Sequence, residues 1–123
     1  MKLIRAIVRP EREDDVVDAL EAIGIVSLTK MDVLGRGQQR GIQVGASLYD
    51  EIPKVQLLIV VEAARLDAAI AAIEAAAKTG QHGDGKIFIS SVEAAYTIRT
   101  GQKVAGLAAE AAGTAPAAPP APS

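Results

Sequence analysis

The feature that most constrains the fold of this chain is a strand–helix–strand pattern that occurs twice before residue 101. Residues 2–9 alternate between two sides, which is the period of a β-strand, and residues 13–23 then carry apolar side chains at helical spacing. Further strands are expected at 26–34, 55–61 and 86–90, a second helix from Leu66 to a stop at 78–80, and a short fifth strand at 95–99.

This order predicts an α+β fold, the ferredoxin-like βαββαβ sandwich, in which two helices cover one face of a four-stranded antiparallel sheet. We expect Ile4, Ala6, Val8 and Leu58, or their neighbours, to lie on the other face, which nothing else in the chain covers. Because large exposed apolar patches mark interaction surfaces, the bare face favours a homo-oligomer. A monomer with a partly apolar face is the less favoured alternative.

The composition argues against several classes of protein. The chain has 13 lysines and arginines against 15 aspartates and glutamates, so it lacks the basic surface that binds nucleic acid. With no cysteine and one histidine, His82, it has no thiolate site and no multi-histidine zinc site within one chain. No apolar run reaches the ~18 residues of a membrane helix, and residues 1–5 do not resemble a secretory signal. A cytoplasmic location is therefore expected.

The C-terminal part of the sequence differs from the rest. From residue 105 onward the chain is almost entirely alanine, glycine and proline, and four of its six prolines lie there. Such a segment has too few large apolar side chains to offset the entropy lost on ordering. We therefore expect a folded domain over residues 1–101 and a disordered Ala/Pro-rich tail over residues 102–123.

Two glycine-rich segments, residues 35–41 and 80–86, carry the candidate chemistry. Glycine lets backbone amides turn toward an anion, and lysine or arginine supplies charge to phosphate oxygens. Residues 80–86 fit G-x-x-x-x-G-K, but Ile87 replaces the Ser or Thr of a Walker loop, and the segment runs from helix to strand. Either segment alone is better explained as a plain turn. Taken together with their basic residues, the two segments support a pair of plain turns and a phosphate site equally.

From residue 1 to about 101 the sequence resembles the PII nitrogen-regulatory signalling proteins. The segments that carry the resemblance are Val8, Arg9 and Pro10 with residues 14–16, then residues 35–41, 52–55, 79–80, 83–88 and 98–101. The family consists of homotrimers of ferredoxin-like subunits that bind ATP or ADP between neighbouring subunits. It binds 2-oxoglutarate beside Mg-ATP at the base of a long T-loop, here residues 37–53. The resemblance thus implies a sensor of nitrogen and energy status that docks onto transporters, enzymes or transcription factors and is not itself an enzyme.

The resemblance also implies particular site residues. Those that match the family's nucleotide-binding positions are Ile7, Thr29, Gly35, Arg36, Gly37, Gln38, Val60, Thr79, Gly83, Asp84, Gly85, Lys86 and Arg99. Those that match its 2-oxoglutarate-binding positions are Gly37, Gln39, Arg40, Gly41 and Lys54. By the same match, Gln39 helps to hold Mg²⁺ with the ATP phosphates, Lys54 pairs with an effector carboxylate, and Arg99 reaches a phosphate across the subunit boundary.

Three departures from the family pattern bear on function. Gln38 and Thr97 stand where the family commonly has arginine, which removes positive charge near the phosphates and bears on the preference between ATP and ADP. The T-loop is shorter than usual and lacks the tyrosine of the usual modification segment, since Tyr49 lies near its descending end. Covalent modification of the loop is therefore not expected.

Residues 35–45 and 49–54 together resemble the nitrogenase-associated branch of the family. Members of that branch partner with a second PII paralogue and inhibit nitrogenase in response to 2-oxoglutarate and adenylates. The resemblance therefore implies a homotrimer, which can mix with a paralogue, and a target such as nitrogenase, a transporter or a metabolic enzyme.

Other functions stay open at this point. Within the wider family, the alternative is a regulator of carbon or bicarbonate uptake that senses adenylates, against which Gln39 and Lys54 argue. A ferredoxin-like hydrolase of the acylphosphatase type would need an asparagine to position water, and the chain contains none. A third alternative is a structural assembly module that uses the open sheet face and the tail.

Several of these residues also have plainer explanations. Lys54, taken without the resemblance, is an edge-strand lysine that discourages aggregation. Asp14 and Asp15 suit the positive end of a helix dipole. Arg9 is expected to be solvated or to lie between subunits, and His82 to be solvated.

Overall fold

The structure, a computed structural model, describes the backbone of residues 1–36, 42–44, 47–49 and 51–106, and the side chains of 1–36 and 51–106. In chain order its strands and long helices are β1 (Lys2–Val8), α1 (Glu13–Ala22), β2 (Thr29–Gly35), β3 (Ile42–Val44), β4 (Ser47–Tyr49), β5 (Ile52–Val61), α2 (Leu66–Ala77) and β6 (Lys86–Ser91). Short 3₁₀ turns, η1 (Pro10–Arg12) and η2 (Ala63–Arg65), precede the two helices.

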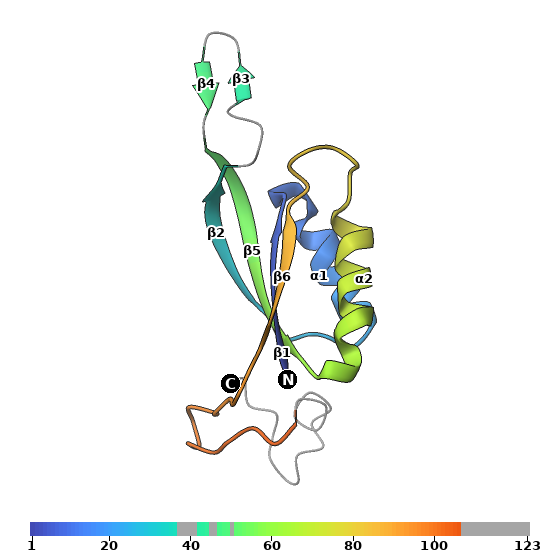
Figure 1. Ribbon diagram of the computed structural model, residues 1–123, viewed down its shortest axis with the longest axis vertical. Coiled ribbons are helices and arrows are strands. Elements are labelled where there is room, and N and C mark those ends of the chain that lie inside the picture. Colours follow the sequence, from blue (N-terminus) through green and yellow to red (C-terminus); the bar gives the residue numbers. More distant parts are fainter. Residues whose placement is uncertain (37–41, 45–46, 50, 107–123) are drawn as a thin grey trace.

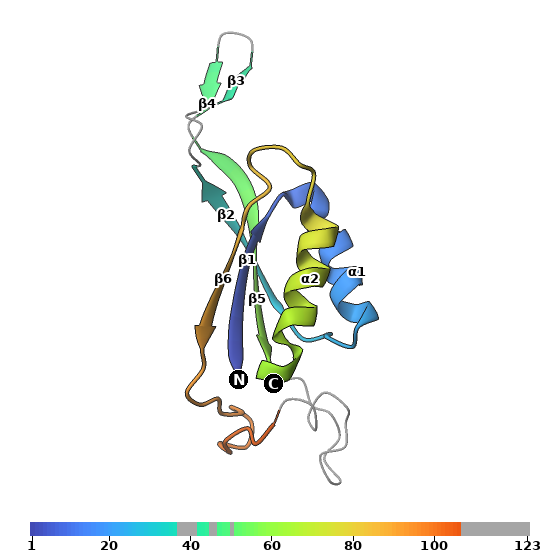
Figure 2. The same ribbon diagram turned by 45° about the vertical axis from the view of Figure 1, so that its right-hand side comes forward.

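The four long strands form one antiparallel sheet in the order β2, β5, β1, β6. Helices α1 and α2 lie side by side on one face of it (Figure 1). The ferredoxin-like fold predicted from the strand–helix–strand order is therefore confirmed. The sequence pattern did not predict β3 and β4, which pair with each other as a hairpin beyond the ends of β2 and β5 (Figures 1 and 2).

The core lies between the sheet and the helices, and it corrects one expectation. Ile4, Ala6 and Val8 are at most 2% exposed and belong to the core with apolar residues of β5 and both helices. Their expected place on the open face was wrong. Both sides of β1 carry apolar residues, because Ile7 alternates with them, so alternation alone did not tell which side the helices cover. Leu58, opposite Arg5 in the register, lies on the open face as expected.

The open face of the sheet carries large apolar side chains beside polar ones such as Arg5 and Gln56. It carries Ile7 from β1, Leu58 and Val60 from β5, Met31 from β2 and Phe88 from β6, as the register of the strands requires. Phe88 is 51% exposed and Met31 41%. Within the described part of the chain, no helix covers this face (Figure 2), and a patch of this kind is typical of an interaction surface.

Both helices are short. Acidic residues fill the first turn of α1, where they suit the positive end of the helix dipole. Gly24, with a φ of 85°, ends this helix in the left-handed conformation that the sequence predicted, and the amide of Ile25 donates to the carbonyl of Leu20 at 2.9 Å.

Among the residues that the structure describes, no helix is long and apolar enough to cross a membrane.

The segment after β6 is a hairpin, and the expected strand at 95–99 is wrong. Only an isolated bridge forms there, between Tyr96 and Lys103, flanked by a bond from the amide of Val104 to the carbonyl of Ala95 at 2.8 Å. The turn Thr97–Gly101 interrupts the extended backbone, since the amide of Gly101 donates to the carbonyl of Thr97. The hydrogen-bonded chain thus runs past the expected domain boundary at 101. The greater part of the expected tail, residues 107–123, lies outside the described residues.

Candidate functional site

The candidate site is built around the loop of residues 78–85, which joins α2 to β6, and Asp84 organises this loop. Its carboxylate accepts hydrogen bonds from the amides of Thr79 and Gly80, each at 2.8 Å, and from the Thr79 hydroxyl. The Nε of Arg9 donates to the same carboxylate at 3.1 Å. The bonds from Thr79, followed by those from Gly80 and Arg9, hold the pKa of Asp84 well below its ordinary value, so Asp84 is ionised and fully engaged.

Gly85 fixes the loop against the central strand β1. Its φ is 107°, and a Cβ added there would lie 1.7 Å from the carbonyl oxygen of Ile7. No other residue type fits so close to the backbone of β1. The next residue, Lys86, pairs with Ile7 in the sheet register. The amides of the glycine loop are therefore held in a defined place at one end of the sheet.

Lys54, the third residue of β5, brings the base of the T-loop to the glycine loop. Its Nζ donates to the carbonyl oxygen of Gly83, and its side chain lies against Gly35, where an added Cβ would be 3.3 Å from the lysine Cγ. Burial lowers the pKa of Lys54, and the neighbouring charge of Arg9 lowers it further. An anion that reached this lysine would counteract the lowering of its pKa, because opposite charge favours the protonated amine.

Sequence analysis missed Arg9. It is paired within the chain rather than solvated, and its side chain is only 24% exposed. Besides the bond to Asp84, its Nη2 donates to the carbonyl of His82 at 2.7 Å. The signal in the sequence that could have identified it is the opposite charge of the two residues. Arg9 is the basic residue at the end of β1, and Asp84 is the acidic residue of the loop that follows α2.

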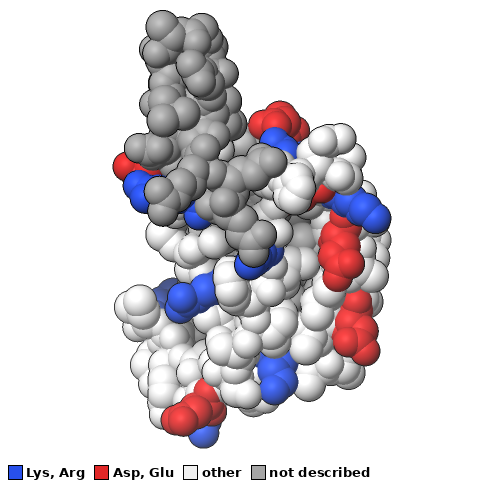
Figure 3. Space-filling view, turned by 45° about the horizontal axis from the view of Figure 1, so that its top comes forward, with Lys and Arg blue, Asp and Glu red and all other residues white. Residues whose placement is uncertain are grey.

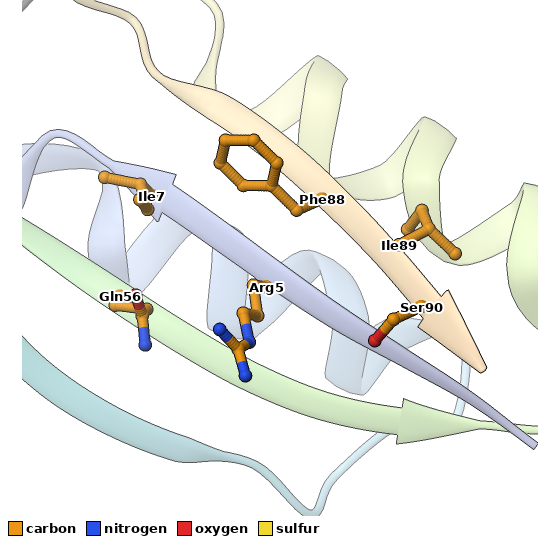
Figure 4. A pocket seen from close by; sticks show the side chains of 6 residues that line it. All are labelled: Arg5, Ile7, Gln56, Phe88, Ile89 and Ser90. Atoms are coloured by element: carbon orange, nitrogen blue, oxygen red, sulfur yellow. The ribbon is translucent and has the colours of Figure 1, made fainter. Parts of the chain in front are cut away.

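Two shallow depressions lie on either side of this region and share Ile7. One, of about 460 Å³, is on the open face and is lined by Arg5, Ile7, Gln56, Phe88, Ile89 and Ser90 (Figure 4). The other, of about 440 Å³, lies beneath the glycine loop and is lined by Asp84, Gly85 and Lys86 with residues of β1 and the end of α2. Figure 3 shows a row of acidic side chains along the right-hand side of the molecule and several lysine and arginine side chains across the rest of the view. Lys54 and Lys86, next to the glycine loop, supply the positive charge that would favour an anion.

The predicted site residues fall into three groups. The first group meets at one end of the sheet and consists of Ile7, Gly35, Lys54, Thr79, Gly83, Asp84, Gly85 and Lys86, with the exposed Arg36 directly after β2. The second group lies elsewhere in the same chain: Thr29 and Val60 are farther along the sheet, and Arg99 lies in the hairpin at the opposite end from the glycine loop (Figures 1 and 2). The third group lies outside the described residues and consists of Gly37, Gln38, Gln39, Arg40 and Gly41.

The described residues also bear on metal binding. No group of three or more histidine, cysteine, aspartate or glutamate residues among them could hold a metal ion. The predicted magnesium ligand, Gln39, is outside the described part of the chain. A magnesium ion brought in by nucleotide phosphates would need few protein ligands, because Mg²⁺ keeps phosphate and water oxygens around it.

Comparison with known proteins decides the family. The family model of the nitrogen regulatory protein P-II matches residues 1–102. The chain belongs to the P-II family. It is 56% identical over 103 residues to the "Nitrogen fixation nifHD region GlnB-like protein 1" of Methanobacterium ivanovii. The aligned residues cover 84% of this chain and 98% of that protein.

Other members of the family are similar over the same region. The "Nitrogen fixation nifHD1 region GlnB-like protein 1" of Methanosarcina barkeri is 53% identical over 102 residues, 83% of this chain and 97% of that protein. The "Nitrogen regulatory protein P-II 1" of Methanothermobacter thermautotrophicus is 47% identical over 106 residues, 83% of this chain and 92% of that protein. The family and the branch predicted from residues 35–45 and 49–54 are therefore confirmed.

Proposed function

We propose that this P-II protein is a homotrimeric sensor of nitrogen and energy status. It binds ATP or ADP, with Mg²⁺ and 2-oxoglutarate, between subunits, and it regulates a target through residues 37–53. It works in the cytoplasm and is not an enzyme. The nifHD names of its relatives favour nitrogenase as the target over a transporter or a metabolic enzyme.

One observation carries the proposal. The amine of Lys54, at the base of the T-loop, donates to the carbonyl of Gly83 in the glycine loop, so the two segments that would hold effector and nucleotide are in direct contact. Ligands bound at both places would then share this contact, so each could change the affinity for the other.

The charges suit a triphosphate. ATP carries about four negative charges, which Lys86 and Arg99 would answer with charge-assisted hydrogen bonds, and backbone amides of the glycine loop would add to them. Gln39, the phosphates and the oxo-acid would supply the oxygen ligands that Mg²⁺ prefers. Asp84 already accepts hydrogen bonds from Thr79, Gly80 and Arg9, so it is not free to act as a general base. The site is therefore suited to binding rather than to reaction.

The place of Arg99 supports a site shared between subunits. Within one chain the glycine loop and the hairpin that holds Arg99 are at opposite ends of the sheet (Figure 1). Both can serve one nucleotide only if they come from different chains. The open apolar face offers a surface on which chains can associate.

Titration calorimetry with ATP and Mg²⁺, in the presence and absence of 2-oxoglutarate, tests the proposal. We expect ATP binding at millimolar or lower concentration, oxo-acid binding only when Mg-ATP is present, and a solution mass three times that of the 12.7 kDa chain. Absence of any heat change with ATP, or a mass equal to that of one chain, would contradict it.

A further inference from the structure

Arg9 holds the glycine loop with two of the three nitrogens of its guanidinium. Its Nε donates to Asp84 at 3.1 Å and its Nη2 donates to the carbonyl of His82 at 2.7 Å. The remaining nitrogen, Nη1, lies 4.0 Å from Glu11 in the turn that follows β1. The fork of this side chain is thus directed at the loop from the end of the central strand.

The geometry requires arginine. The Nε and Nη2 groups lie in one plane and can serve two acceptors at once, whereas the single ammonium of a lysine cannot hold the same two acceptors in a fixed plane. Here the acceptors are the side chain of Asp84 and the main chain of His82, on either side of Gly83. The two bonds therefore fix the path of the backbone between them.

The effect of Arg9 passes on through Asp84. The same carboxylate binds the amides of Thr79 and Gly80, so the ion pair with Arg9 settles where the first turn of the loop lies. At Gly83, an added Cβ would be 3.3 Å from Nη2 of Arg9. The guanidinium thus lies directly against the backbone that would face the phosphates.

We propose that Arg9 is a positioning residue of the phosphate-binding loop, acting through Asp84 and the His82 carbonyl and not by serving as a phosphate ligand. This inference rests on the proposed function. Because Nε and Nη2 of Arg9 already bind Asp84 and the His82 carbonyl, Arg9 shapes the loop before any nucleotide arrives, and binding then costs less ordering entropy.

Replacement of Arg9 by methionine tests this inference in the full chain. We expect the Arg9→Met variant to bind ATP about tenfold more weakly, because binding must then also order the loop. Amide hydrogen exchange at residues 80–85 should speed up in the absence of any ligand. The matched control is Arg12→Met, which removes a nearby arginine paired at 3.4 Å with Asp15 and should change neither measurement.

A double-mutant cycle separates positioning from general destabilisation. Asp84→Asn keeps an acceptor for the loop amides and removes the charge that Arg9 binds. If the two residues act as one unit, the double variant loses less affinity than the product of the two single losses. Arg9→Lys, which preserves the charge, should recover only part of the affinity. Strictly multiplicative losses, or wild-type exchange rates at residues 80–85 in Arg9→Met, would overturn the inference.

The two proposals fail in different ways. If the unmodified protein binds no ATP, the proposed function falls, and the ligand-free exchange rates of Arg9→Met decide by themselves whether Arg9 holds the loop. If the unmodified protein binds ATP and Arg9→Met binds it equally well, the positioning role falls and the proposed function stands.

Discussion

The loop of residues 78–85 and the hairpin of residues 95–104 lie at opposite ends of the sheet, and both carry residues of the proposed nucleotide site. The loop is held from three sides, by Asp84 within it, by Arg9 from β1 and by Lys54 from β5. The hairpin is joined by backbone bonds between its two arms, and Ile98 at its turn is 98% exposed. The chain thus holds one half of the proposed site in place by itself and leaves the other half facing outward.

Substitution of Gly85, the glycine that touches β1, should have the largest effect on the difference between the loop and the hairpin. In Gly85→Ala, the new Cβ would overlap the carbonyl of Ile7 in a strained backbone conformation, and we expect a loss of about 3 kcal/mol in the free energy of unfolding together with loss of ATP binding. Urea denaturation measures the first effect and calorimetry the second.

The matched control is a glycine of the hairpin. Gly101 also has a positive φ, of 70°, but an added Cβ would meet nothing within 4 Å. Gly101→Ala should therefore cost only about 1 kcal/mol for backbone strain. Equal losses in the two variants would mean that the loop is no more tightly held than the hairpin.

Removal of Lys54, which joins the base of the T-loop to the glycine loop, should have the next largest effect. Lys54→Met should weaken 2-oxoglutarate binding in the presence of Mg-ATP by more than about tenfold, because the effector carboxylate loses its cation. ATP affinity should fall by no more than about threefold, since Lys54 also supports the Gly83 carbonyl with one exposed hydrogen bond. Lys30→Met, which breaks an ion pair with Glu13, is the control. Unchanged oxo-acid binding would favour the regulator that senses adenylates alone.

Removal of Arg99 tests the hairpin side of the comparison between loop and hairpin. Arg99→Met should weaken ATP binding about tenfold by loss of a phosphate contact. The residue is exposed, so the thermal unfolding of the ligand-free protein should stay the same, in contrast with Gly85→Ala. A fall in the melting temperature without a change in affinity would assign Arg99 to stability instead.

Acid should loosen the loop by a smaller amount. The folded-state pKa of Asp84 lies below its ordinary value of 3.8, so the carboxylate contributes stability that is present above that value and is lost as the pH falls further. Hydrogen exchange at residues 79–84, compared between pH 5 and pH 3 after correction for intrinsic rates, should show protection decreasing in the wild type. The difference should be much smaller in Asp84→Asn, and an equal decrease in both proteins would assign the effect to other groups.

The sequence predicted the fold well because the fold depends on local periodicity. The strands, the helices and the helix end at Gly24 can be predicted from the spacing of residue types within a short stretch of sequence. The predicted face of β1 was wrong because Ile7 is at least as apolar as its neighbours Ala6 and Val8, and only the register with β5 shows which side is covered.

The site was predicted only where a motif marks it. Residues 83–86 stand out as glycines around Asp84 before a lysine, but the bond from Arg9 to Asp84 joins residues 75 positions apart, and no local pattern records it. The hairpin at 95–104 also escaped prediction, because its turn is held by backbone bonds that many sequences can form.

The strand β5 begins at Ile52, at the end of the segment that would meet a target, and its tenth and last residue is Val61. It is hydrogen-bonded to β2 on one side and β1 on the other, and it carries Lys54 near its start and Val60, on the open face, near its end. A tilt imposed on Ile52 by a docked protein would therefore move Lys54, the proposed effector ligand, and the open face of the sheet together. One continuous strand, rather than a chain of hinges, would transmit the signal.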